Sequence, residues 1–180
     1  ASGVPAALYG IAAQSISALR LAALQAGALR AMWRSSTRSA SELGMALFVP
    51  WRSSPVAYSI IKTCLAMRSC ILSGGVELDA LACAYHCNTV VGPFRALQDA
   101  LSRIGARLSP DGRTILGPQG PLLWLAGPMA HVRDDLLGRV QDRALQALAK
   151  RRPVLAGAAN GFDRFLTLQF DPVPYTPLRA

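Results

Sequence analysis

Aromatic, acidic and lysine residues are scarce in this sequence, and each scarcity excludes something. Only 7% of the 180 residues are aromatic and 16% are charged, whereas 52% are hydrophobic. So little charge combined with so much apolar content excludes an intrinsically disordered chain. Few aromatic but many alanine residues favour close-packed helices over a large β core, because alanine has the highest intrinsic helix propensity.

The patterns that mark common catalytic sites are also missing. No serine lies in a Gly-x-Ser-x-Gly elbow, and no glycine-rich loop is followed by Lys-Ser or Lys-Thr. His131 lies near Asp134 and Asp135, but a histidine in the first turns of a helix is more often a solvated surface residue. We therefore expect no catalysis and no cofactor in this chain.

The cysteines are few, and their spacing is a poor match to a metal site. Cys83, His86 and Cys87 fall within one helical turn, and Cys64 or Cys70 could add a fourth zinc ligand. Structural zinc sites usually take cysteine pairs from two separate knuckles, which this spacing lacks. We expect no metal and no disulfide, because free cysteine commonly serves as a small buried apolar residue and no secretory signal is present.

Long apolar runs are absent as well. The nearest to the roughly 18 to 20 residues of a membrane span is residues 1–19, which contain glycine, proline, glutamine and serine, so we expect no membrane partner. Residues 1–41 are acid-free, serine-rich and punctuated by arginine, which also fits an organelle transit peptide. Since Ala1 is not an initiator methionine, we expect a piece of a longer protein.

Arginine supplies nearly all of the net charge of +9, because Lys62 and Lys150 are the only lysines. Residues 1–76 carry seven basic residues against the single acid Glu42, whereas the remainder carries twelve basic and nine acidic residues. The planar guanidinium fork matches phosphate oxygens, so an anion-binding surface is expected in the first half. A GC-rich coding sequence would supply the same arginine without selection for binding.

Apolar periodicity and helix breakers predict a mainly α protein, a bundle of five or six helices with one small β-hairpin near residues 106–117. In the first helix, the apolar stripe at helical spacing runs through Ile16, Leu19, Ala23, Ala26 and Leu29, with Ala22 and Leu29 as an alternative. Helices are expected at residues 15–33, 39 or 41–48, 54–73, 77–87, 93–105 and 128–152.

Capping and turn residues set several of these boundaries. Ser53 or Ser54 is expected to cap the helix that starts at Pro55. The hairpin is expected to turn at residues 109–112, where a proline at the second position of a type I turn is followed by a glycine. Residues 122–125 fit a strand or a helical turn. We divide the chain into a basic helical subdomain (1–91), a helix–hairpin–helix subdomain (92–170) and an irregular tail (171–180).

Two basic stripes at helical spacing are candidate nucleic-acid-binding faces. Trp33 and Trp51 lie near the first stripe and fit either base stacking or core anchoring. For the second stripe the alternative is a solvated face in which Asp135 and Arg139 form an ordinary i,i+4 pair. The first stripe comprises Arg30, Arg34 and Arg38, and the second comprises Arg139, Arg143, Gln146 and Lys150.

Two stretches carry a resemblance to a known family. Pro5-Ala6-Ala7-Leu8-Tyr9-Gly10, followed by an Ala/Leu/Arg helix, resembles the segment just after the reverse-transcriptase core of LINE-type (non-LTR) retrotransposon polyproteins. The order Gly92-Pro93-Phe94-Arg95, Pro110-Asp111-Gly112, Leu122-Leu123-Trp124, Arg151-Arg152-Pro153 and Gly161-Phe162-Asp163 is similar to retroelement-derived reading frames of protists. The likeness covers most of the chain as a pattern of order and spacing.

The resemblance implies a non-catalytic thumb or connection region that contacts RNA or DNA within its parent polyprotein, in the nucleus or cytoplasm. The family's polymerase motif, a Tyr/Phe-x-Asp-Asp hairpin, does not occur in this chain, and Ile11-Ala12-Ala13 stands where the family often has an acidic and an aromatic residue. The alternative from the composition is a helical protein–protein interaction or assembly subunit, an organellar one included, with no nucleic-acid role.

Overall fold

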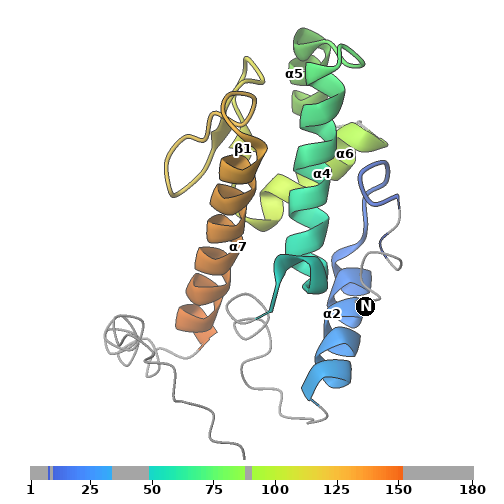
Figure 1. Cartoon of the computed structure of the whole chain (residues 1–180), viewed down its shortest axis with the longest axis vertical. Helices are drawn as coiled ribbons and strands as arrows, with labels where there is room; N and C mark the ends of the chain where they lie inside the picture. The colour runs from blue at the N-terminus through green and yellow to red at the C-terminus, as the bar shows by residue number, and fades with distance from the viewer. Residues whose placement is uncertain (1–7, 9, 34–48, 88–90, 152–180) are drawn as a thin grey trace, which may run out of the picture. The chain divides into compact units, whose positions relative to one another are not determined.

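The structure, a computed structural model, describes residues 8, 10–33, 49–87 and 91–151 of the chain. The chain divides into two compact units, Ala1–Leu145 and Gln146–Ala180. The prediction of a mainly α fold with one small β-hairpin is confirmed (Figure 1). In order, the elements of the described residues are α2 (Ala18–Trp33), the 3-10 turn η1 (Trp51–Ser53), α4 (Pro55–Leu72), α5 (Leu78–His86), α6 (Pro93–Arg103), β1 (Arg107–Leu108), β2 (Ile115–Leu116) and α7 (Met129–Arg151).

Local sequence signals set the ends of α4 as predicted. Of the two candidate caps, Ser54 is the one used, and its side chain accepts a hydrogen bond from the Ala57 N–H at 3.4 Å. Pro55 occupies the first turn, where its missing N–H costs nothing. Gly74 adopts a positive φ of 75° just after the last turn and ends the helix.

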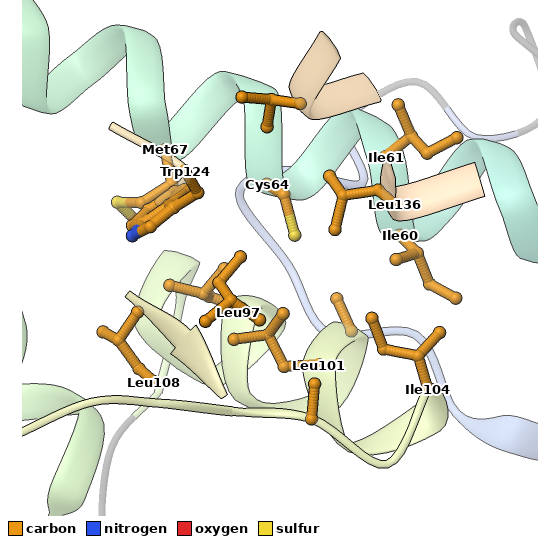
Figure 2. Packing of buried hydrophobic residues seen from close by; sticks show 14 of the residues in the cluster. Ile60, Ile61, Cys64, Met67, Leu97, Leu101, Ile104, Leu108, Trp124 and Leu136 are labelled. Carbon is orange, nitrogen blue, oxygen red and sulfur yellow. The ribbon is translucent and has the colours of Figure 1, made fainter. Parts of the chain in front are cut away.

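The core lies mainly between α4 and α6, which pack directly on each other. Ile60 and Cys64 of α4 are fully buried, as are Leu97 and Leu101 of α6. Figure 2 shows Cys64 pointing from α4 toward the α6 side chains, with Trp124 and Leu136 entering the same cluster from elsewhere in the chain. The two helices therefore meet through their apolar faces.

The hairpin has the predicted turn. β1 and β2 pair antiparallel, with Leu108 opposite Ile115, and the Gly112 N–H donates to the Ser109 carbonyl at 2.9 Å. Gly112 has a φ of 71°, which only glycine adopts without strain. Of residues 122–125, for which a strand or a helical turn was expected, Leu122 forms an isolated antiparallel bridge with Ile115, and Trp124 and Leu125 lie in a bend.

Trp124 ties this hairpin to the core. Its side chain is fully buried, and its indole N–H donates to the Gly112 carbonyl at 3.0 Å. Strands of two residues cannot form a stable hairpin alone. The apolar indole and its one hydrogen bond together hold the turn against the helices.

The face of α2 that is buried differs from the predicted one. Leu21 and Gln25 are buried, whereas Leu19 is 84% exposed and Ala23 and Ala26 are exposed. The predicted stripe through Leu19 is therefore wrong. In a helix with apolar residues on every side, periodicity cannot select one face, so the contact with α4 decides it.

Three predicted features are not tested by this structure. The helix expected at residues 39 or 41–48 and the tail at 171–180 lie outside the described residues. The boundary expected between residues 91 and 92 falls between α5 and α6, which pack together within the first unit, and the two subdomains stay a prediction.

By length and composition alone, α4 is apolar enough to cross a membrane, with a mean hydropathy of 1.2 over 18 residues. Half of that window is buried inside the protein, however. A helix that supplies one side of a core passes the same test, so this finding carries no argument for a membrane.

The choice between the two serine caps can be tested by stability. Ser54→Ala should lower the free energy of unfolding by about 1 kcal/mol, because the Ala57 N–H loses its acceptor. Ser53→Ala, the matched control, should change it by less than about 0.5 kcal/mol. Urea unfolding followed by circular dichroism measures both, and equal losses would show that Ser54 is not the cap.

The positive φ of Gly112 predicts opposite effects of alanine at two glycines. Gly112→Ala should destabilise the protein by about 1–3 kcal/mol, because the backbone is in the left-handed region and the new Cβ would lie 2.9 Å from Leu78 Cδ1. Gly27→Ala lies within α2 with open space around its Cβ, and should stabilise by about 0.5–1 kcal/mol. The same urea titrations report both, and a neutral Gly112→Ala would contradict the turn geometry.

Candidate nucleic-acid interface

Most exposed basic side chains of the described residues have no carboxylate partner. The ion pairs in this part of the chain join Arg95 to Asp99, Arg133 to Asp134 and Arg139 to Asp135. The other exposed cations form no ion pair with a carboxylate of the described residues. They are Arg20, Arg30, Arg52, Lys62, Arg107, Arg113, Arg143 and Lys150.

Of the first predicted stripe, the structure places only Arg30. It lies in the last turn of α2, is exposed, and donates from Nε to the Ala26 carbonyl one turn earlier at 3.3 Å. Arg34 and Arg38 lie outside the described residues, as does the side chain of Trp33. Of this stripe, the structure therefore describes only the exposed guanidinium of Arg30.

The second stripe is not one exposed face. Arg143 and Lys150 are exposed, but Arg139 is only 4% exposed. Position 139 lies beside Leu136 and Val140, which are both buried, and the loop that includes Gly117 and Gly120 covers its guanidinium. The expectation that Arg139 presents its charge to a nucleic acid is corrected, because this side chain serves the fold.

Arg139 and Arg68 both hold the loop at residues 117–127. Arg139 Nε binds Asp135 Oδ1 at 2.6 Å, and its Nη2 donates to the Gly120 carbonyl at 3.0 Å. Arg68 is 6% exposed and donates to the carbonyls of Leu125 and Gly127 at 3.4 and 2.6 Å. Each guanidinium also keeps one buried nitrogen without a partner in the described residues, Arg139 Nη1 and Arg68 Nε.

A second feature, which sequence reasoning missed except for Trp51, is an aromatic and cationic cluster where η1 meets α4. The rings of Trp51 and Tyr58 stack with centroids 5.9 Å apart and planes 16° apart. The Arg52 guanidinium carbon lies over the Trp51 ring, 5.4 Å from its centroid. Lys62 is exposed one turn beyond Tyr58 on the same side of α4. We call Trp51, Arg52, Tyr58 and Lys62 the stacking cluster.

The signal for this cluster is present in the sequence but is short. A Trp-Arg pair precedes the Ser-Pro helix start, and a tyrosine and a lysine follow at a spacing of four within the helix. What the sequence does not reveal is the 3-10 turn, which carries Trp51 back onto the first turn of α4.

The candidate zinc ligands are not brought together. Cys83, His86 and Cys87 are exposed on or just after α5, whereas Cys64 lies in the core, where burial raises the pKa of its thiol to about 12. In the described part of the chain, no group of three potential ligands is placed to hold a metal ion.

His131 and its acidic neighbours lie on the surface of α7. His131 is exposed, and the pKa of Asp134 is lowered chiefly by the hydrogen bond from Arg133, 2.8 Å away. This pairing stabilises the ionised carboxylate and, in return, raises the pKa of the Arg133 guanidinium. The arrangement is an ordinary surface ion pair.

Comparison of the chain with protein-family models, with curated proteins and with solved structures found no match in any of the three.

The separate roles of Arg139 and Arg143 predict separate effects on stability. Arg139→Met keeps the apolar stem but removes the hydrogen bonds to Asp135 and Gly120, and should lower the free energy of unfolding by about 1.5–3 kcal/mol. Arg143→Met, on the exposed side of the same helix, should change it by less than about 0.5 kcal/mol. Thermal and urea unfolding measure both, and an Arg139→Met variant as stable as the parent would mean that Arg139 does not hold the loop.

Proposed function

We propose that this chain is a non-catalytic, basic helical module that contacts RNA or DNA, in the manner of the thumb or connection region that follows a retroelement polymerase. One observation carries the proposal. The three packed elements α2, η1 and α4 contain no acidic residue, yet present four exposed cations to solvent. These cations are Arg20, Arg30, Arg52 and Lys62.

The arrangement of these elements brings two of these cations, Arg30 and Arg52, to the same end of the helix pair. α2 and η1 each pack against α4, and Figure 1 shows α2 and α4 running in opposite directions. Arg30 lies at the C-terminal end of α2, and Arg52 lies in η1, directly before the start of α4. In the antiparallel pair of α2 and α4, these two positions are therefore at the same end. Like charges on one surface repel unless an anion neutralises them, which favours a polyanionic ligand.

The acidic residue that the structure connects to this region is already engaged. Asp99 of α6 accepts a hydrogen bond from Ser15 and pairs with Arg95 at 3.2 Å. It therefore does not neutralise the cations of α2 and η1. Phosphate groups, which a guanidinium binds through two parallel N–H donors, would supply the anionic partners that these cations lack among the described residues.

A second candidate function, a helical interaction or assembly subunit, has an observation of its own. α2 turns Leu19, Ala23 and Ala26 toward solvent, and Leu19 is 84% exposed. A helix with apolar residues all round is usually covered on more than one side. A helical protein partner could cover this face without any nucleic acid.

Salt dependence separates the two functions. If the chain makes three phosphate contacts, raising the salt from about 50 to 200 mM should weaken its binding to duplex DNA about 40-fold, because bound counterions are released. Fluorescence anisotropy with labelled duplex and single strands measures this. Absence of binding to either at about 50 mM salt would overturn the nucleic-acid proposal and leave the assembly role.

The surface responsible is tested with two charge-matched triple variants of the full chain. Arg30→Gln, Arg52→Gln and Lys62→Gln together should reduce the slope of log affinity against log salt by about 3. The control, Arg107→Gln, Arg113→Gln and Arg143→Gln together, removes the same charge elsewhere and should reduce it by less than about 1. Equal reductions would show that binding follows net charge and does not use the α2–η1–α4 surface.

A further inference from the structure

We infer that the stacking cluster is a platform for unpaired bases, so that a single strand or a single-stranded junction is preferred over a continuous duplex as the ligand. This inference rests on the proposed function and adds the class of nucleic acid. It follows from the chemistry of the four residues and from where the fold places them.

The two rings lie at the edge of the core and are not enclosed by it. Trp51 packs against the core cluster but is only half-buried, and Tyr58 is half-buried as well. Tyr58 lies on the side of α4 away from Ile60 and Cys64, whose side chains are fully buried. Its hydroxyl makes no hydrogen bond within the described residues. The aromatic surface therefore extends into solvent.

The Arg52 guanidinium, which lies over the indole of Trp51, can interact with a nucleic acid in two ways. Arg52 is exposed and pairs with no carboxylate of the described residues, and its guanidinium carbon lies 5.4 Å from the centroid of the Trp51 ring, where the ring attracts the cation. A guanidinium plane stacks on bases as an aromatic ring does, and it also binds phosphate. Arg52 can therefore extend the platform or move aside to a phosphate while a base takes its place.

Lys62 completes the site with a contact of a different kind. It follows Tyr58 by one turn, is exposed, and has no ion pair in the described part of the chain. An ammonium one turn along from a stacked ring suits the phosphate that follows a stacked base. Aromatic rings beside cations are the combination by which proteins bind single strands without reading their sequence.

A duplex cannot use this platform without being opened. Its bases already stack on each other, and only their edges are accessible in the grooves. The cations of α2 still contact duplex phosphates, so duplex binding is expected to persist but to make no use of the rings. Loss of a ring should thus affect the two ligands differently.

The experiment uses the full chain and a single strand of about 12 nucleotides carrying 2-aminopurine, free or annealed to its complement. Tyr58→Leu keeps an apolar side chain but removes the ring, and should weaken single-strand binding about tenfold while duplex affinity changes less than about twofold. Tyr58→Phe keeps the ring and should bind like the parent. Phe94→Leu, which removes a half-buried ring of α6 outside the cluster, should also bind like the parent.

Quenching of 2-aminopurine fluorescence reports stacking directly, and should occur with the parent and Tyr58→Phe but not with Tyr58→Leu. If the parent binds both the single strand and the duplex, and Tyr58→Leu binds each of them as well as the parent does, the platform is wrong and the proposed function stands. Loss of single-strand binding by Tyr58→Leu and Phe94→Leu alike would also overturn the platform, because any lost ring would then have the same effect. If the parent binds neither ligand, the proposed function itself fails.

Discussion

The packing of α4 on α6 is the contact on which the rest of this structure depends. Ile60 and Cys64 meet Leu97 and Leu101 with no solvent exposure, and burying each large aliphatic side chain contributes about 1.5–3 kcal/mol before conformational entropy is subtracted. The two-residue strands and the 3-10 turn are too short to bury enough apolar surface to be stable by themselves. They are ordered because apolar side chains of these elements and of the adjoining loop, Trp124 among them, reach the cluster that the two helices create. The stacking cluster is part of the same dependence, since α4 carries Tyr58 and positions the turn that carries Trp51.

Arginine does two different jobs in this chain, and the difference is one of environment. Arg68 and Arg139 are buried and donate to backbone carbonyls, so the oxygen dipoles of one loop take the place of water around each charge. Arg30 and Arg52 are exposed and face no carboxylate of the described residues. A count of basic residues along the sequence does not distinguish the buried arginines from the exposed ones. Removing Arg68 from the exposed set still leaves the acid-free elements with more positive charge than they can neutralise.

The features that the sequence predicted well are those decided within a few residues. The Ser-Pro start of α4, the glycine after its last turn and the proline and glycine of the hairpin each act on their own backbone, so one sequence suffices to locate them. The features that it missed depend on neighbours distant in the chain. Apolar residues surround α2, and only α4 determines that Leu21 is buried and Leu19 is not. Arg139 is spaced like a surface residue, and its burial follows from the loop that returns to cover it. The stacking of Trp51 on Tyr58 required the 3-10 turn, which has no strong sequence signal.

The close approach of the hairpin turn to α5 also limits how this chain can vary. A Cβ at position 112 would meet the end of the Leu78 side chain and lie 3.5 Å from its carbonyl oxygen, so the turn and the first residue of α5 occupy adjoining space. Substitutions at two such positions are not independent, because the effect of one depends on the size of the other. A smaller residue at position 78 should therefore lessen the cost of a side chain at position 112, while the strain of the positive φ remains. Two segments 34 positions apart in the sequence are coupled in this way.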